Sequence, residues 1–300
     1  MTAHTASVAQ DRGTAHGVVD FRVRPPFRSF LGLPHFSQST GLDAPVWERS
    51  GLELTQVTAP SQRLKSMELF LAEMEEAGIG KAVVVGRHTA RRGSVENTDV
   101  VNLMTLYPDK FVGFGALTLE GDVRDEVQRH VDWGFKGVIF EPTLLAPPRH
   151  VDDPSLDDVY GALEEAGLVL MLMMSVYVGP DATWSHPVRL QRVLDLFPRL
   201  PVVVSHVCWP NVDEFLGLAF RYPNLYAMPD LYGNTPGLPG RAALTEAVNS
   251  FLSHRMVFGS AYPARALGAS IEEFKSWEFA DEMIRDRCLS GNASRLLGLA

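Results

Sequence analysis

The chain is poor in cysteine, in long apolar runs and in clustered positive charge, and each shortage excludes a class of protein. Its 300 residues include two cysteines, Cys208 and Cys288, which are too few for a disulfide framework and indicate a reducing compartment. No apolar run reaches the roughly 18–20 residues that a membrane-spanning helix needs. The first 17 residues lack the apolar segment of a signal peptide. We therefore expect a cytoplasmic protein with no membrane partner.

The charge balance argues against a nucleic-acid partner. Lys and Arg number 27 against 36 Asp and Glu, so the formal net charge is −9. The densest basic group, Arg87, Arg91 and Arg92, is too short to follow a phosphate backbone, and we expect it to form an exposed, solvated face. Hydrophobic residues make up 46% of the chain, which is enough for a large buried core.

Short apolar runs alternate along the chain with stretches of helical periodicity. This order is typical of parallel strands connected by helices. The expected strands are 18–21, 82–85, 111–117, 138–140, 168–174, 202–205, 225–228 and 256–258. The expected helices are 62–77, 122–133, 156–166, 187–197, 211–222 and 240–253, with further C-terminal helices at 271–277 and 280–297.

Eight strands that alternate with helices predict an α/β fold, a single (β/α)8 or TIM barrel, over residues 18–300. Residues 1–17 have no periodicity and are expected to form a flexible tail. An open, doubly wound sheet would call for a glycine-rich turn after the first strand, and Arg24, Pro25 and Pro26 stand there instead.

The connection between the first strand and its helix, residues 25–60, is far longer than usual. Its apolar residues are too numerous for a disordered segment. They are Phe27, Phe30, Leu31, Leu33, Phe36 and Trp47. We expect this loop to cap the barrel mouth, with a plain packing insertion as the alternative.

The carboxyl ends of barrel strands carry the catalytic groups in folds of this kind. Asp20, Arg22 and Arg24 have the same parity on the first strand and can face the same way. The other polar candidates at strand ends are His88, Glu141, His206, Asp230, Tyr232 and Tyr262.

Four segments together resemble the amidohydrolase-related family, in the branch of aminocarboxymuconate-semialdehyde decarboxylase, resorcylate decarboxylases and metal-independent lactone hydrolases. They are residues 19–25 (VDFRVRP), 203–206 (VVSH), 255–263 (RMVFGSAYP) and 291–298 (GNASRLLG). The resemblance implies a barrel whose mouth holds a divalent metal through two histidines of an Asp-Phe-His-x-His-Pro motif, further histidines on the fifth and sixth strands, and an aspartate after the eighth.

This chain departs from that ligand set at most positions. Arg22 and Arg24 replace the histidine pair, Met173 stands at the fifth strand, and Ala261 replaces the aspartate, so that His206 alone remains. Permanently charged guanidiniums repel a cation, so we expect no metal and no other cofactor. A site rebuilt from His206, Glu141, Asp230 and His88 is the disfavoured alternative.

Arg22 and Arg24 admit two interpretations. They could form a structural ion-pair network with Asp20, Glu141 and Asp230, because an unpaired buried charge is strongly disfavoured. They could equally bind a carboxylate or phosphate of a substrate, for which the guanidinium fork is well shaped.

The remaining candidates divide into catalytic and binding groups. His206, Glu141 and Asp230 are the candidate catalytic residues, with His206 or Glu141 as acid or base and Asp230 as the residue that orients His206 or pairs with an arginine. His88, Tyr232 and Tyr262 join the two arginines as candidate substrate-binding residues, although packing against Pro263 is an alternative role for Tyr262.

The leading hypothesis is a metal-independent hydrolase that acts on a small anionic substrate, a carboxylate-bearing lactone, ester or amide, as the resemblance implies. A non-metal decarboxylase (a lyase) or isomerase of a small carboxylic acid is the second hypothesis. The third is a catalytically silent barrel that binds a metabolite or a partner. A homodimer is a further expectation, because barrels with long caps often pair.

Overall fold

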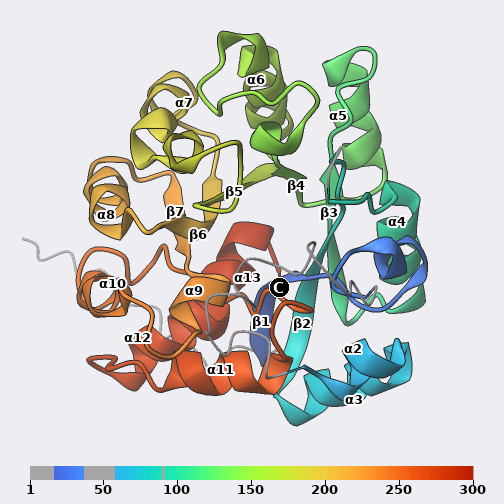
Figure 1. Ribbon diagram of the computed structural model, residues 1–300, viewed down its shortest axis with the longest axis vertical. Coiled ribbons are helices and arrows are strands. Elements are labelled where there is room, and N and C mark those ends of the chain that lie inside the picture. Colours follow the sequence, from blue (N-terminus) through green and yellow to red (C-terminus); the bar gives the residue numbers. More distant parts are fainter. Residues whose placement is uncertain (1–16, 37–57, 90–91, 300) are drawn as a thin grey trace, which may run out of the picture.

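The computed structural model describes residues 17–36, 58–89 and 92–299, and its centre is a curled sheet of seven parallel strands (Figure 1). The strands pair in chain order, each with the next. Continuous apolar runs form them because both faces of the sheet are buried. They are β1 Val18–Val23, β2 Ile79–Val85, β3 Phe111–Ala116, β4 Gly137–Phe140, β5 Val169–Ser175, β6 Val202–Trp209 and β7 Leu225–Met228.

The barrel is closed by residues 255–262, here called the closing segment, in place of a full eighth strand. Met256 forms a single parallel bridge with Ala227 of β7, and Tyr262 forms one with Val23 of β1. The Phe21 N–H also donates to the Phe258 carbonyl at 2.8 Å. The expected barrel is therefore confirmed. The expected strand at 256–258 lies in the eighth position but forms a single β-bridge there, through Met256. The chain turns soon afterwards at Ala261, which is left-handed (φ 63°).

Helices surround the sheet (Figure 1). The α-helices are α2 Pro60–Leu64, α3 Met67–Glu76, α4 Asn97–Leu106, α5 Val123–Asp132, α6 Asp157–Ala166, α7 Leu190–Leu196, α8 Val212–Arg221, α9 Asp230–Gly233, α10 Arg241–Val248, α11 Leu267–Lys275, α12 Glu282–Asp286 and α13 Asn292–Leu297. Short 3-10 turns are η1 Arg28–Gly32, η3 Pro142–Leu144, η4 Pro154–Leu156, η5 Ala182–Ser185 and η6 Pro187–Arg189, and a π turn, η7 Arg287–Gly291, joins α12 to α13. Within the described residues, no helix is both long enough and apolar enough to cross a membrane.

The structure corrects one helix prediction and adds a helix that was not predicted. The expected helix 62–77 is two helices, because Lys65 adopts a left-handed conformation (φ 51°) and Ser66 then caps α3 by accepting from the Leu69 N–H. Helix α4 was not predicted, since its sequence NTDVVNLMTL is rich in Asn, Thr and Val, which favour helices weakly.

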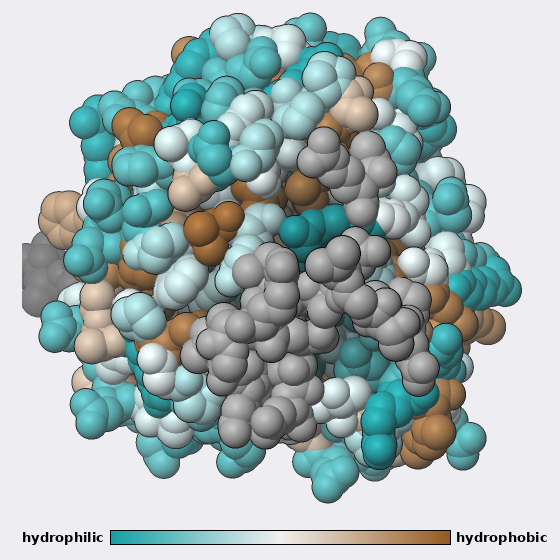
Figure 2. Space-filling model, in the orientation of Figure 1, coloured by the Kyte–Doolittle hydropathy of each residue, from teal (hydrophilic) through white to brown (hydrophobic). Residues whose placement is uncertain are grey.

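The core has two layers. One hydrophobic cluster fills the inside of the sheet, where Phe21 meets Phe114 edge to face with ring centroids 5.6 Å apart, and α13 adds Ala293 and Leu297 to it. The larger cluster lies between the strands and the surrounding helices. On the face shown in Figure 2, hydrophobic side chains are scattered among hydrophilic ones around the ring of helices.

A register shift in β1 turns the arginines toward the barrel mouth. Val19 and Phe21 belong to the inner cluster, so strict alternation would point Arg22 outward. The pairing of β1 with β2 shifts between Asp20 and Val23, and a shift of this kind re-aims the side chains that follow it. Arg22 and Arg24 consequently line the pocket at the mouth.

The predicted tail and cap loop remain predictions. Residues 1–16 and 37–57, which include Trp47, lie outside the described residues. The described start of the loop packs against the core through Phe30, Leu33 and Phe36, each of which is buried.

Asp20 ties β1 to the closing segment. Its Oδ1 accepts from the backbone N–H of Arg22 at 3.1 Å and of Ser260 at 2.9 Å. The carboxyl is fully buried, and this burial raises the pKa of Asp20 to about 6, against the opposing effect of the hydrogen bonds.

The raised pKa of Asp20 makes a measurable prediction. A carboxyl whose folded pKa exceeds its unfolded value of 3.8 stabilises the fold below that value, and this stability is lost as the pH rises through about 6. An asparagine side chain keeps the accepting oxygen and does not ionise. Asp20→Asn should therefore gain about 2.4 kcal/mol relative to wild type between pH 4 and pH 7, as measured by urea unfolding. A stability difference that does not vary with pH would show that Asp20 is ionised throughout.

Candidate functional site

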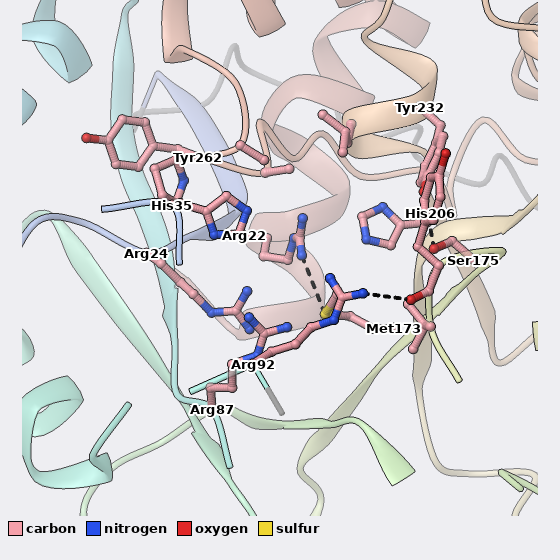
Figure 3. A pocket seen from close by; sticks show the side chains of 16 residues that line it. Arg22, Arg24, His35, Arg87, Arg92, Met173, Ser175, His206, Tyr232 and Tyr262 are labelled. Atoms are coloured by element: carbon pink, nitrogen blue, oxygen red, sulfur yellow. Dashed lines mark hydrogen bonds between the residues drawn. The ribbon is translucent and has the colours of Figure 1, made fainter. Parts of the chain in front are cut away.

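A pocket at the carboxyl ends of the strands encloses about 550 Å³ of empty space, part of it open to solvent. Side chains from β1, β5, β6, α9 and several loops converge on it (Figure 3). Its lining residues are Arg22, Arg24, His35, Arg87, Arg92, Met173, Ser175, Tyr177, Val178, His206, Leu231, Tyr232, Ala261, Tyr262, Pro263 and Ala264.

His206 and Asp230 form a hydrogen-bonded pair at this pocket. The His206 Nδ1 lies 2.6 Å from Asp230 Oδ1, and the Ser205 hydroxyl donates to Asp230 Oδ2 at 2.7 Å. Burial would raise the pKa of Asp230, but His206, Arg22 and Ser205 outweigh it and lower that pKa to about 2. The ionised carboxylate accepts from Nδ1–H, which leaves the His206 Nε2 without a proton. Burial lowers the pKa of His206 despite Asp230, so the imidazole is neutral at pH 7.

The backbone at this pair is unusual. His206, Val207 and Cys208 have φ values of 73°, 45° and 57°, and Asp230 has 33°. Non-glycine residues in this left-handed region cost of order 1–3 kcal/mol each, and they persist where the surrounding structure holds them. Such strain concentrated at the end of β6 is typical of functional sites.

Arg22 is held by Asp230 and leaves part of its guanidinium exposed to the pocket. Its Nε lies 3.0 Å from Asp230 Oδ2. One terminal nitrogen donates to the sulfur of Met173 at 3.6 Å, which is a weak acceptor. Asp20 binds the backbone of Arg22 rather than its guanidinium, so the predicted network does not include that carboxylate.

Glu141 forms a buried, bidentate ion pair with Arg87. Arg87 Nε and Nη2 donate to the two Glu141 oxygens at 3.1 and 2.7 Å. Burial raises the pKa of Glu141, but Arg87 and Arg24 outweigh it, so the pKa lies below its ordinary value. Both carboxylate oxygens are engaged, and Glu141 is thereby a poorer candidate base than His206.

Arg24 is poorly satisfied and has no carboxylate at close range in the described structure. Its Nη2 lies 3.8 Å from Glu141 and 3.4 Å from the Gly86 carbonyl, and its buried Nε has no hydrogen-bond partner in the described part of the chain. Burial and the neighbouring Arg87 lower the pKa of Arg24 well below its ordinary value, although Glu141 raises it. The protein therefore holds a guanidinium here at an electrostatic cost.

The three remaining candidates differ in their placement. Tyr232 lies in the pocket, where its hydroxyl donates to Ser175 Oγ at 3.3 Å and its ring stands edge-on to His206. The Tyr262 ring lines the pocket, yet its hydroxyl points away and pairs with Ser61 Oγ at 2.8 Å (Figure 3). His88 is half-buried and is not among the lining residues.

Among the lining residues that the sequence analysis missed are Arg92 and His35. Arg92 is half-buried, and it reaches across to the Tyr177 carbonyl at 3.0 Å. Together with the buried Arg87 it corrects the expectation of a solvated basic face, while Arg91 lies outside the described residues. The density of arginines at a strand end was the available signal. His35 lies in the described start of the cap loop. Its position in that loop was the one feature of the sequence that could have pointed to it.

The charges of the site do not balance. Four guanidiniums line the pocket, those of Arg22, Arg24, Arg87 and Arg92. Two ionised carboxylates lie against them, Asp230 on Arg22 and Glu141 on Arg87 and Arg24. The described part of the pocket therefore has an excess of positive charge and attracts anions.

The residues present do not fit a divalent metal. Within the described ranges, no group of three or more His, Cys, Asp or Glu side chains lies close enough to hold one. His206 uses Nδ1 for Asp230, and guanidiniums occupy the space beside its other nitrogen (Figure 3). A cation placed there would meet several fixed positive charges.

The chain belongs to the amidohydrolase family, whose model matches residues 19–299. The structure of an uncharacterized TIM-barrel protein from Bordetella bronchiseptica is 39% identical to it, covers 94% of this chain and 98% of that one, and superposes with a TM-score of 0.83. None of the curated proteins matches the chain.

More distant solved structures share the fold. A probable 2-pyrone-4,6-dicarboxylic acid hydrolase from Acinetobacter baumannii, with citric acid bound, is 17% identical over 94% of this chain and 99% of that one, with a TM-score of 0.66. A 5-carboxyvanillate decarboxylase from Novosphingobium aromaticivorans, complexed with manganese and a nitrobenzoic acid, is 14% identical over 95% and 97%, with a TM-score of 0.62.

The arginine–glutamate cluster predicts unequal effects of two substitutions. Glu141→Gln leaves two buried guanidiniums without a counter-ion and should cost about 3–5 kcal/mol of unfolding free energy. Arg87→Met should lower the unfolding free energy less, because Arg24 remains as a partner for Glu141 and the repulsion between Arg87 and Arg24 disappears. The folded pKa of Glu141 is lowered, so its contribution to the free energy of unfolding is fully present above about pH 4.5, the ordinary pKa. This contribution is lost only as the pH falls through the lower folded pKa.

Urea unfolding at pH 7 and at pH 3 measures both effects. Arg124→Met is the control, because its ion pair with Glu165 is exposed and should contribute little. A larger loss for Arg87→Met than for Glu141→Gln would contradict the charge balance described above.

Proposed function

We propose that this protein is a metal-independent hydrolase that binds a small carboxylate-bearing substrate at its arginines. The observation that carries the proposal is the neutral His206, held by the ionised Asp230, beside guanidiniums that lack enough carboxylates. A base and an anion-binding surface then share one pocket. Membership of the amidohydrolase family and the hydrolase among the distant relatives support this choice.

His206 is the proposed base. Asp230 holds the imidazole so that the unprotonated Nε2 is free to remove a proton from water. As the water oxygen attacks a lactone or ester carbonyl, His206 accepts that proton and Asp230 stabilises the imidazolium. The bond from the carbonyl carbon to the leaving oxygen then breaks, and His206 returns the proton to that oxygen. Asp230 is thus a positioning residue.

Arg22 and Arg24 are the proposed anion-binding residues. Arg22 presents near His206 a terminal nitrogen that contacts a weak acceptor, the Met173 sulfur, and this nitrogen can stabilise the negative charge that develops on a carbonyl oxygen. Among the described residues the Arg24 Nε has no hydrogen-bond partner, and the nearest carboxylate to its guanidinium is Glu141 at 3.8 Å. Most of its donors are therefore available to a ligand. An excess of guanidiniums suits a substrate with more than one carboxylate. The dicarboxylic acid in the name of the distant hydrolase and the citric acid in its structure agree with this inference.

Tyr232 and Glu141 have supporting roles in this proposal. Tyr232 stacks on Trp209 with an interplanar angle of 12° and packs perpendicular to the His206 ring, which helps to fix the plane of the imidazole. Glu141 holds Arg87 and Arg24 in place. His88 and the hydroxyl of Tyr262 have no part, since the first is outside the lining and the second binds Ser61.

Decarboxylation is the second candidate, and the same arginines favour it. Guanidiniums that hold a carboxylate can also stabilise the enolate that forms when carbon dioxide leaves. Incubation with 2-pyrone-4,6-dicarboxylate separates the two reactions. Loss of the pyrone absorbance without release of carbon dioxide supports hydrolysis, and release of carbon dioxide supports decarboxylation.

Substitutions at Arg24 test the anion site. Arg24→Met should abolish citrate binding, measured by isothermal titration calorimetry, while the barrel still folds, because the substitution removes a cation that is poorly compensated. Arg24→Lys should recover only part of the affinity, since a point charge cannot reproduce a bidentate contact. If Arg24→Met unfolds the protein and citrate never protects the wild type against heat, the arginines are structural and the silent barrel is favoured.

Metal analysis tests the proposed independence from metals. Protein purified without chelator should contain well below one equivalent of zinc or manganese, and chelator should leave citrate affinity unchanged. Stoichiometric metal that resists dialysis would contradict the proposal and would point to His206 with Glu141 or Asp230 as ligands.

A further inference from the structure

His35 reaches the pocket from the segment that follows η1. The segment is anchored on both sides of this residue, because Leu33 and Phe36 are buried in the core. The His35 carbonyl also accepts from the Gln62 side chain of α2 at 2.9 Å. The imidazole is therefore held at the pocket by packing of its neighbours. In Figure 3 it lies across the Arg22 guanidinium from His206.

The ring of His35 is incompletely satisfied in the structure. Its Nδ1 is buried and has no hydrogen-bond partner among the residues that the structure describes. A buried polar atom without a partner costs about 1–3 kcal/mol, so such atoms are rare and call for an explanation. Burial lowers the pKa of His35 to about 3, with further contributions from Arg87, Arg24, Arg22 and Arg92. The ring is thus neutral at pH 7.

The guanidiniums around His35 cannot accept a hydrogen bond from its ring N–H, whichever nitrogen carries the proton. Guanidiniums carry donors only, so an N–H that faces them has no acceptor. The two carboxylates of the site are engaged elsewhere, Asp230 with His206 and Arg22 and Glu141 with Arg87. An acceptor for His35 must therefore come from outside the described residues of the pocket. The anion that the guanidiniums attract supplies such acceptors in its oxygens.

We propose that His35 is a ligand-binding residue that donates a hydrogen bond to an oxygen of the bound anion, on the side of the pocket opposite His206. This inference rests on the anion site of the proposed function and adds a residue that defines its specificity. The two histidines differ in role, because an ionised carboxylate supports His206 and none supports His35. His35 recognises the ligand, and His206 moves the proton.

A bound anion should also change the ionisation of His35. Its charge offsets that of the four guanidiniums, so the pKa of His35 should rise when the pocket is filled. A histidine outside the pocket, such as His150, would not respond in this way.

Citrate binding measures the contribution of His35. Calorimetry on the full chain should give a dissociation constant about tenfold weaker for His35→Ala, as expected for the loss of one hydrogen bond to a charged group. His35→Asn should recover part of the loss, because its amide nitrogen can donate from nearly the position of Nδ1. His150→Ala is the matched control, since His150 is also half-buried with an unpartnered Nδ1 but stacks on Trp184 outside the pocket.

Nuclear magnetic resonance of the histidine rings in the wild type gives a second readout that requires no variant. The His35 ring signals should shift with added citrate, and their pKa should rise, while those of His150 should not move. Citrate affinity that is unchanged in His35→Ala, or His35 signals that ignore citrate, would overturn the inference and leave the arginine site intact. Absence of citrate binding by the wild type would overturn the anion site and the role of His35 together.

Discussion

The gathering of four guanidiniums around two buried carboxylates is the constraint on which this site depends. A buried charge without a partner is strongly disfavoured, so each arginine is held by whatever acceptor the barrel mouth provides. Arg87 has both oxygens of Glu141, and Arg22 has Asp230 at 3.0 Å. The nearest described carboxylate to Arg24 is Glu141 at 3.8 Å. The remaining positive charge helps to keep both pocket histidines neutral and makes an anion the natural complement.

The backbone that presents these groups departs from regular strand geometry where the chemistry requires it. The register shift in β1 turns Arg22 and Arg24 into the pocket, although Val19 and Phe21 already point into the barrel. The left-handed run from His206 to Cys208 ends β6 and sets the imidazole against Asp230. Packing of the barrel interior around Phe21 and Phe114 stabilises the frame that holds these strained segments.

Most of the fold followed from the sequence because strands buried on both faces appear as apolar runs with helical stretches between them. Helix α4 could not be predicted in this way, because Asn, Thr and Val have weak helix propensities and packing on the barrel determines its conformation. The meeting of Arg22, Arg24, Glu141, His206 and Asp230 was predictable from their places at strand ends. The contribution of His35 and the outward hydroxyl of Tyr262 was not, because each depends on contacts between distant segments, with Gln62 and Ser61 respectively.

A crystal structure of the protein grown with citrate tests the central claim most directly. The account predicts a carboxylate of citrate between the guanidiniums of Arg22 and Arg24, with another citrate oxygen within hydrogen-bonding distance of His35. The Arg87–Glu141 and His206–Asp230 pairs should remain as they are in the free protein. Citrate bound elsewhere, with Arg24 closed onto Glu141, or a divalent ion coordinated by His206, would contradict it.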